Sequence, residues 1–220
     1  MANKLIHARM SEHNSKNGTR GDQTTNEVSI TNYYNHTLGW YTLRAYNSIL
    51  NRYIRKYAQL LANNNNVGYS QSDRLSLLNE LSSNNWEINK IKPCNCDCSS
   101  FVRVCIILAC RELSIDYKKI TNFTTSNEKS VLLGSGLFYL VTTGNKMDGD
   151  ILVTKKKGHT AIYYEEYTVK PVNTKEDIHT IALQCIRGDW GNGTDRRKRL
   201  EASGYIYSEV QNEINRLLKG

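Results

Sequence analysis

We expect the centre of the fold at the stretch Asp97-Cys98-Ser99-Ser100-Phe101-Val102-Arg103-Val104-Cys105-Ile106-Ile107-Leu108-Ala109-Cys110. From Ser99 to Leu113 apolar residues fall on nearly every side of a helix, which predicts a helix that is buried on most sides. Cys98 stands where this helix begins, and the positive end of a helix dipole lowers the pKa of a thiol and raises its share of nucleophilic thiolate. Cys98 is therefore a candidate nucleophile.

The segments before this helix are predicted to be a loop and two amphipathic helices. Residues 1–40 are polar and contain several glycines, a composition typical of a loop with a short helix at each end. Residues 41–61 carry apolar side chains at the three-to-four spacing of an amphipathic helix. Residues 73–81 repeat that spacing, with Ser72 as the expected N-cap.

Strands are predicted after the buried helix. The capping-box signature Thr125-x-x-Glu128 first indicates a short helix that ends before Gly134. Residues 150–154 and 159–165 are then rich in strand-forming side chains, and the basic turn between them indicates a hairpin. Helices followed by strands predict an α+β domain over residues 1–170.

The chain changes character after Pro171. A helix is predicted from Thr174 to about Arg187, and a second from about Thr194 to Ala202. The capping box Ser208-x-x-Gln211 indicates a third. Residues 174–220 are therefore expected to form a small three-helix bundle, of a size that is only marginally stable alone.

Length and composition limit the classes of protein to consider. A chain of 220 residues, 39% hydrophobic and 23% charged, fits one folded domain with or without a small appendage. The longest apolar stretches fall short of the roughly 18 residues that span a bilayer, so no membrane insertion is expected. The N-terminus lacks the apolar region of a signal peptide, and we therefore expect the protein to stay in the cytoplasm where it is made.

Net charge limits the kinds of partner to expect, and cysteine content limits the disulfides and metal sites to expect. A net charge of +8 favours a polyanion, either nucleic acid, an acidic membrane surface or an anionic wall polymer. We find no nucleic-acid-binding signature and expect no such partner. The clustered cysteines suit reduced thiols better than a disulfide framework. Cys94, Cys96 and Cys98 could alternatively bind zinc, but no second close Cys or His pair follows, so we expect no metal or other cofactor.

A histidine in the predicted hairpin completes a candidate catalytic pair. His159 lies in the stretch Gly158-His159-Thr160-Ala161-Ile162-Tyr163. A histidine at the start of a strand that packs against the Cys98 helix can take the proton of the thiol. Cys98 and His159 together predict a cysteine hydrolase.

These motifs resemble a known group of enzymes. The Cys98 motif, Gly149-Asp150-Ile151 and Gly158–Tyr163 are similar to the papain-fold peptidoglycan hydrolases of the NlpC and CHAP families, over about residues 89–167. The resemblance implies a papain-like domain that hydrolyses an amide bond in the peptide stems of peptidoglycan. Endopeptidase and N-acetylmuramoyl-L-alanine amidase both stay open.

The resemblance also implies roles for individual residues. Cys98 would attack the carbonyl while its backbone N–H helps to stabilise the oxyanion, and His159 would be the general base and then the acid. Family members orient this histidine with a third polar side chain from a neighbouring strand, for which Glu165 and Glu166 are the candidates. Asp97 and Ser99 flank the nucleophile and are candidate substrate-binding residues.

The N-terminal segment resembles the leader that precedes the catalytic cysteine in lysins of phages that infect Gram-positive bacteria. The resemblance runs over about residues 11–34 and implies that Asp22, Gln23 and Tyr33 contact the substrate. The alternative is a surface loop with no such role.

The last segment resembles the CW-seven cell-wall-binding repeat. The likeness rests on Gly188-Asp189-Trp190-Gly191-Asn192-Gly193, the basic stretch from Arg196 to Arg199, and the tyrosines after Gly204. It implies binding to the disaccharide-peptide unit of peptidoglycan, with sugar-stacking aromatic residues and polar contacts. The candidate binding residues are Asp189, Trp190, Asn192, Arg196 and Tyr205. Trp190 and Tyr205 could alternatively be the core of the bundle.

Both resemblances lead to one substrate. The chain is similar to a phage endolysin, an N-terminal cysteine hydrolase over residues 1–170 with a wall-binding module at 174–220. Such an enzyme would wait in the host bacterial cytoplasm until it is released to the cell wall, and its partner would be bacterial peptidoglycan. The alternative is an inactive wall-binding or virion structural protein. The oligomeric state stays open.

Overall fold

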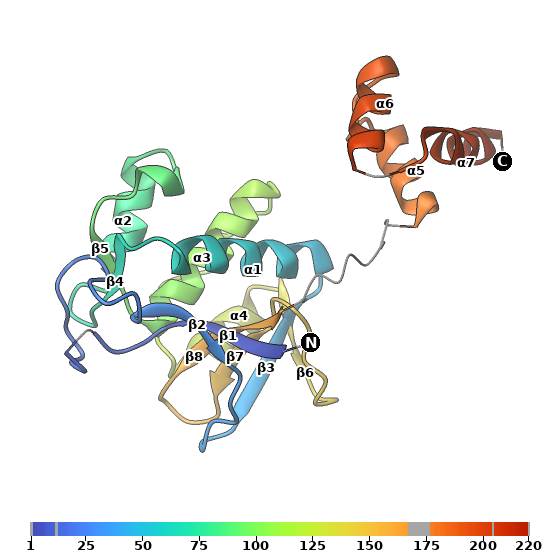
Figure 1. The fold of residues 1–220 in the computed structure, drawn as a ribbon. Coiled ribbons are helices and arrows are strands. Elements are labelled where there is room, and N and C mark those ends of the chain that lie inside the picture. Colours follow the sequence, from blue (N-terminus) through green and yellow to red (C-terminus); the bar gives the residue numbers. More distant parts are fainter. Residues whose placement is uncertain (1, 12, 167–176, 204, 220) are drawn as a thin grey trace. The chain divides into compact units, whose positions relative to one another are not determined.

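The computed structural model in Figure 1 describes residues 2–11, 13–166, 177–203 and 205–219. Contacts divide the chain into two compact units, Met1–Thr168 and Val169–Gly220. The predicted boundary at 170–174 lies outside the described residues. The first unit combines helices with a sheet, so the α+β prediction is confirmed. In the described ranges no helix has the length and apolar character needed to cross a membrane.

The first unit is built on an antiparallel sheet with the strand order β2-β1-β8-β7-β3-β6. The strands are β1 (Ala2–Ala8), β2 (Val28–Asn32), β3 (Trp40–Ala45), β6 (Phe138–Val141), β7 (Ile151–Thr154) and β8 (Thr160–Glu166). The first strand, β1, pairs with β8, and Ile6 lies opposite Ile162. This pairing brings residues from the start of the chain beside the strand that follows His159.

The main apolar core lies between one face of the sheet and the helices. Helices α1 (Ser48–Ala62) and α3 (Cys98–Glu112) share this core with strand residues such as Ile6 and Ile162. Because strand side chains alternate between faces, Leu5 and Tyr163 belong to a smaller cluster on the other face. The shorter elements are α2 (Ser76–Ser83), the 3-10 turn Ile88–Lys90, α4 (Glu128–Gly134) and the parallel strands β4 (Val67–Tyr69) and β5 (Cys94–Cys96).

Helix α3 confirms the prediction of a helix that is buried on most sides. Nearly all of its residues from Cys98 to Cys110 are buried. Its start is held by a capping box, in which the Asp97 carboxylate accepts the N–H of Ser100 at 2.7 Å and the Ser100 hydroxyl accepts the N–H of Asp97 at 2.8 Å. Caps of this kind typically stabilise a helix by about 1 kcal/mol. The cap fixes the point at which Cys98 enters the helix.

The N-terminal segment differs from its prediction. The described part of residues 1–40 forms strands β1 and β2 with long loops, not a loop with a helix at each end. Both faces of β1 are covered, so Leu5 and Ile6 are each buried and the segment lacks the simple alternation of a half-exposed strand. The burial depends on β2 and β8, which are distant in sequence.

Other boundaries also shift. Residues 41–45 of the predicted helix belong to β3 instead, and α1 begins only after Asn47, whose side chain accepts the N–H of Ile49 at 2.9 Å. Neither Ser72 nor Thr125 caps its predicted helix, because α2 and α4 begin after Leu75 and Asn127. Strand β6 was not predicted. The β7–β8 hairpin is confirmed.

The second unit contains helices α5 (Ile178–Arg187), α6 (Gly193–Ala202) and α7 (Tyr207–Lys219). Its core consists of a few apolar side chains: Ile181, Ala182, Cys185, Leu200, Tyr205, Val210 and Ile214. The predicted helix start at Thr174 lies outside the described residues. Gly188 ends α5 in the left-handed conformation at φ 91°, which glycine adopts without strain.

Candidate active site

One cleft of the first unit holds both predicted catalytic residues. Its volume is about 410 Å³, and Cys98 at the start of α3 and His159 just before β8 both line it. The remaining lining residues are His7, Ala8, Arg9, Met10, Lys16, Tyr34, Tyr69, Gln71 and Gly158. Packing of α3 against the sheet therefore brings the thiol and the imidazole to one opening.

Cys98 is a neutral thiol in this structure. Only 8% of the residue is exposed, and burial raises the pKa of Cys98 to about 12. The negative charges that Asp97 and Glu128 can carry add to the rise, whereas the backbone N–H groups of Thr160 and Ser99 oppose it. The prediction that the helix start lowers the pKa of this thiol is therefore wrong, because burial is the largest effect and raises it.

His159 is held by the hairpin turn and is also neutral. Its carbonyl oxygen accepts the N–H of Thr154 at 3.0 Å, and its own N–H donates to the Thr154 hydroxyl at 3.0 Å. Burial, followed by the charges of His36 and Arg9, lowers the pKa of His159 to about 4. At pH 7 the pair is thus a thiol and an uncharged imidazole, not an ion pair.

A second histidine orients His159. The Nε2 of His159 lies 2.7 Å from the Nδ1 of His7, and the Nε2 of His7 lies 3.0 Å from the hydroxyl oxygen of Thr31. If His7 donates through Nε2 to Thr31, its Nδ1 accepts from the Nε2–H of His159. The Nδ1 of His159 is then unprotonated and can take a proton, which is the tautomer a general base needs. Burial lowers the pKa of His7, as it does for His159.

The predicted third residue lies elsewhere. Glu165 is six residues along β8 from His159, a distance of about 20 Å in a strand. It pairs with Asn3 and lines a different pocket together with Arg44 and Asp148. Glu166 lies one residue further away. Neither glutamate is placed to orient the imidazole, and His7 occupies that position instead.

In the second unit the predicted wall-binding residues gather around the loop between α5 and α6. The Arg196 guanidinium donates to the Gly191 carbonyl at 3.0 Å and to the Asn192 side chain at 3.1 Å. Trp190 donates its indole N–H to Gln184 at 2.8 Å and packs edge-on against Tyr205 with ring centroids 5.9 Å apart.

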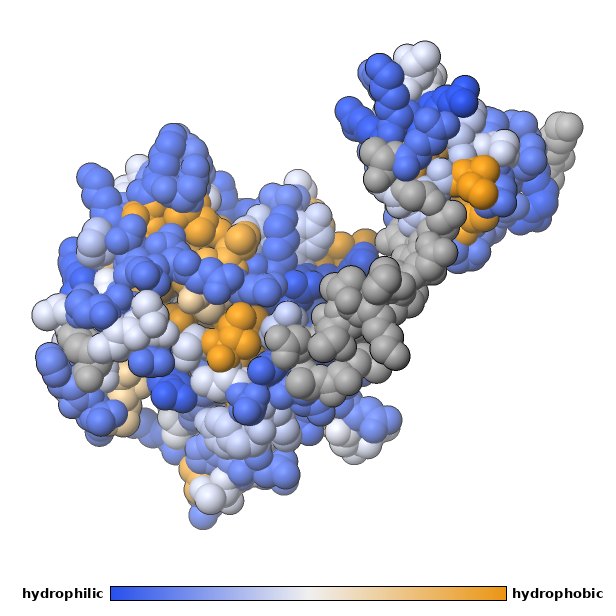
Figure 2. Space-filling model, viewed as in Figure 1, coloured by the Kyte–Doolittle hydropathy of each residue, from blue (hydrophilic) through white to orange (hydrophobic). Residues whose placement is uncertain are grey.

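These contacts separate core residues from exposed ones. Tyr205 is only 9% exposed and belongs to the core, whereas Trp190 is half-buried against it. Asp189 and Asn192 are exposed. In Figure 2 strongly hydrophilic residues cover α6, the helix of Arg197 and Lys198.

Each of the two units matches the model of a known protein family. The family model of the endolysin-like domain matches residues 5–169, which is more than half of the chain. The chain belongs to the endolysin-like domain family. The CW_7 repeat model matches residues 179–218, the second unit. No curated protein and no solved structure matches the sequence. An endolysin-like domain followed by a CW_7 repeat indicates a peptidoglycan-lytic endolysin that is directed to the cell wall.

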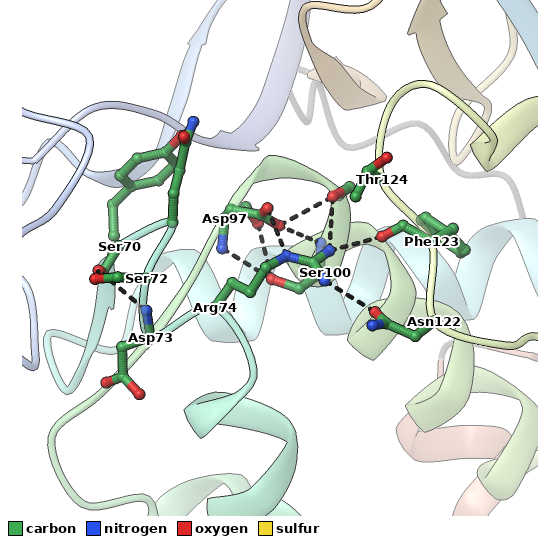
Figure 3. A network of polar contacts seen from close by, with 12 residues as sticks. Ser70, Ser72, Asp73, Arg74, Asp97, Ser100, Asn122, Phe123 and Thr124 are labelled. Carbon is green, nitrogen blue, oxygen red and sulfur yellow. Dashed lines mark hydrogen bonds and ion pairs between the residues drawn. The ribbon is translucent and has the colours of Figure 1, made fainter.

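Within the endolysin-like domain, Asp97 and Ser99 are engaged with the protein itself. The guanidinium of Arg74 donates to the Asp97 carboxylate at 2.7 Å and to the Ser99 hydroxyl at 2.9 Å. It also reaches the carbonyl of Phe123 and the side chain of Asn122, as Figure 3 shows. Asp97 and Ser99 therefore fix the helix start, and their predicted role in substrate binding does not fit these contacts.

The candidate substrate-binding residues of the N-terminal segment, Asp22, Gln23 and Tyr33, also contact the protein itself. The buried carboxylate of Asp22 accepts backbone N–H groups from its own loop, including that of Glu27 at 2.9 Å, so it holds the loop. Gln23 is exposed and donates to the carbonyl of Gly21 at 2.7 Å. Tyr33 packs on Tyr163 and lines another pocket. The neighbouring Tyr34 lines the cleft instead and was missed.

The remaining cysteines of the endolysin-like domain are buried and free. Cys94 and Cys96 lie in β5, where burial raises the pKa of both thiols. Among the described residues no cluster of three or more His, Cys, Asp or Glu side chains has the geometry to hold a metal ion. Cys98 is the cysteine that lines the cleft.

A larger pocket of the endolysin-like domain lies away from Cys98 and His159. It has a volume of about 720 Å³ and is lined by Tyr57, Leu60, Asn63, Asn64, Asn65, Asn66, Trp86, Ile88 and Asn89. Arg111, near the end of α3, stacks on Trp86, whereas Cys98 begins that helix. This larger pocket contains neither a nucleophile nor a base, so the smaller cleft is the candidate active site.

Proposed function

We propose that this endolysin is a cysteine hydrolase that cleaves an amide bond in the peptide part of peptidoglycan. The observation that supports the proposal is the cleft that Cys98 shares with His159, together with the 2.7 Å contact between His159 and His7. A nucleophile, a base and an orienting group are the parts that acyl transfer requires.

The proposed reaction follows from the neutral state of the pair. His159 takes the proton of the Cys98 thiol as sulfur attacks the substrate carbonyl, and the backbone N–H of Cys98 helps to hold the oxyanion. The carbon–nitrogen bond then breaks, and His159 returns the proton to the leaving amine. Water hydrolyses the remaining thioester with His159 again acting as base, which regenerates the thiol.

The fold of the domain is proposed to be papain-like, of the NlpC and CHAP type. Two features support this: the nucleophile begins a buried helix, and the base precedes a strand of the antiparallel sheet. Arg9 and Lys16 line the cleft and favour a peptide that carries carboxylates. The third catalytic group would come from the N-terminal strand.

Mass spectrometry of digested peptidoglycan tests the proposed function. Purified cell walls treated with the protein should release muropeptides with new amino groups, and the position of those groups distinguishes an endopeptidase from an N-acetylmuramoyl-L-alanine amidase. Release of reducing sugar ends without new amino groups would contradict amide cleavage. Binding to the walls without any release would favour the inactive wall-binding protein.

The second unit is proposed to supply wall affinity and not chemistry. A protein truncated to residues 1–172 should still cut soluble muropeptides but should bind whole walls about tenfold or more weakly, because the module raises local concentration. Pull-down with purified walls measures this. Equal wall affinity with and without the module would refute its binding role, and an unfolded truncation would show that the helices belong to the main core.

The exposed cations of α6 should make this retention sensitive to salt. Exposed charges are screened beyond about 8–10 Å at 0.1–0.15 M ionic strength. Lys198 and Arg199 are exposed, whereas Arg196 is tied to its own loop. The full-length Lys198→Gln and Arg199→Gln double variant therefore tests the role of these charges. Its retention on cell walls should depend less on salt than that of the unmodified protein.

A further inference from the structure

A buried carboxyl group lies beside the candidate active site and has no part in the proposed reaction. Glu128 is the first residue of α4 and is 0% exposed. Its Oε1 lies 2.8 Å from the hydroxyl oxygen of Thr160, the residue that follows His159. The other carboxyl oxygen, Oε2, is buried without a hydrogen-bond partner.

The contacts of the Thr160 hydroxyl group indicate the charge state of the Glu128 carboxyl group. The Thr160 hydroxyl has a single proton, yet its oxygen lies 2.8 Å from Oε1 of Glu128 and 2.9 Å from the carbonyl oxygen of Leu152. An ionised Glu128 would compete with that carbonyl for one proton. If Glu128 carries its own proton, it donates to Thr160 and Thr160 donates to Leu152, so both contacts become hydrogen bonds.

The surroundings agree with a neutral group. A buried carboxylate needs a cation or several donors, because an ionised group without them loses several kcal/mol of solvation. In the described part of the chain Glu128 has no ion-pair partner, whereas the nearby Asp97 is paired with Arg74 at 2.7 Å. The unpartnered Oε2 would then be a carbonyl oxygen. Burial of a neutral carbonyl oxygen costs less free energy than burial of a charged carboxylate oxygen. Burial and the charge of Asp97 raise the pKa of Glu128 well above its usual value.

The position of Glu128 connects it to the catalytic pair. It holds the side chain of Thr160 at 2.8 Å, and the backbone N–H of the same residue lowers the pKa of Cys98. Asp97, just before α3, acts on the pKa of both Glu128 and Cys98, and Glu128 also acts on that of Cys98. A charge on Glu128 would oppose formation of the Cys98 thiolate.

We propose that Glu128 is a protonated positioning residue that fixes Thr160, and through it the start of β8, while keeping negative charge away from Cys98. The part that concerns Cys98 and His159 rests on the proposed function. The protonation of Glu128 rests only on the contacts of its carboxyl group.

Glu128→Gln is the discriminating variant because glutamine is neutral, has nearly the same shape and can donate to Thr160 through its amide. It should keep wall hydrolysis within about threefold and leave the pH dependence of Cys98 alkylation unchanged. Glu128→Met, which removes the donor, should lose about tenfold or more, as for other residues that orient a catalytic group. Glu112→Gln removes a carboxyl that is 46% exposed at the other end of α3 and serves as the control.

Two measurements test protonation without hydrolysis. The infrared band of a protonated carboxyl group should be present at pH 7 in the unmodified protein and in Glu112→Gln, and missing in Glu128→Gln. A raised folded pKa means that the unfolded chain loses the Glu128 proton first, so this group lowers stability as pH rises above about 4.5. Glu128→Gln should therefore melt higher than the unmodified protein at pH 8, and the difference should vanish toward pH 4.

The outcomes separate this inference from the proposed function. A missing infrared band, or equal melting shifts at pH 4 and pH 8, would overturn the protonated state. Loss of activity in Glu128→Gln as large as in Glu128→Met would overturn the positioning role, since the carboxyl itself would then be needed. If Cys98→Ser left hydrolysis intact, the proposed function would fail, while the infrared and melting results would still decide the state of Glu128.

Discussion

Replacement of Cys98 by serine is expected to lower the release of muropeptides from purified walls by about 10⁴-fold or more, with the fold intact. Loss of a nucleophile from a site of this kind removes most of the catalysis, and a serine hydroxyl beside a weakly basic imidazole is a far poorer nucleophile than a thiol. The initial rate of muropeptide release measures the effect, and a thermal melt checks the fold.

Cys94→Ser and Cys96→Ser are the matched controls. Both residues lie in β5, and their thiols donate only weakly, to the carbonyls of Asn66 and Gly68. Each variant should keep most of its activity. Unchanged activity in Cys98→Ser would exclude Cys98 as the nucleophile. Comparable losses in all three variants, together with stoichiometric zinc, would support a metal site instead.

Alkylation of the unmodified protein adds an independent readout. Iodoacetamide should label Cys98 before the other cysteines, because Cys98 lines the cleft and the others are more deeply buried. Since the pKa of Cys98 is raised to about 12, the labelling rate should keep rising above pH 9. A rate that levels off near pH 6 would instead indicate a thiolate–imidazolium pair.

Local sequence pattern was enough for the parts of the site that lie within single elements. The apolar residues that surround the axis predict helix α3, and Cys98 stands immediately before that run, where the helix begins. The β7–β8 hairpin was predicted from its two strand-forming runs and the turn between them. These elements carry Cys98 and His159, two of the proposed catalytic groups.

The third group depends on a contact that no local pattern encodes. His7 and His159 are 152 residues apart, and their meeting requires β1 to pair with β8. Because Leu5 and Ile6 are covered on opposite faces, β1 does not show the alternation that would identify it. The stretch after His159 therefore offers Glu165 as an orienting residue, whereas the side chain that contacts the imidazole is His7 in β1.

Long-range partners also engage two of the candidate substrate-binding residues, Asp97 and Ser99. Asp97 and Ser99 look available beside a nucleophile, but Arg74 from another segment binds both. Helix position suggested an acidic thiol at Cys98, yet the packing that buries it has the larger effect on its pKa. Motifs identify which residue types are present, and tertiary contacts decide which of them face the substrate.

His7→Ala should lower the rate of wall hydrolysis by about 10²-fold or more, a smaller loss than removal of the nucleophile causes. Without His7 the imidazole of His159 can rotate and adopt either tautomer, so a smaller fraction has the unprotonated Nδ1 that the proposed base requires. His7→Gln can still accept from the Nε2–H of His159 and should recover part of the loss. Initial rates on purified walls measure both variants.

Glu165→Gln is the sharpest control for this prediction, since Glu165 lies on the same strand as the residue after His159 but lines another pocket. Its rate should stay within about twofold of the unmodified protein. A larger loss in Glu165→Gln than in His7→Ala would contradict the orienting role of His7. If His7→Ala lost activity while His7→Gln recovered none of it, the imidazole of His7 would have to carry a proton in the reaction, and not merely accept a hydrogen bond from His159.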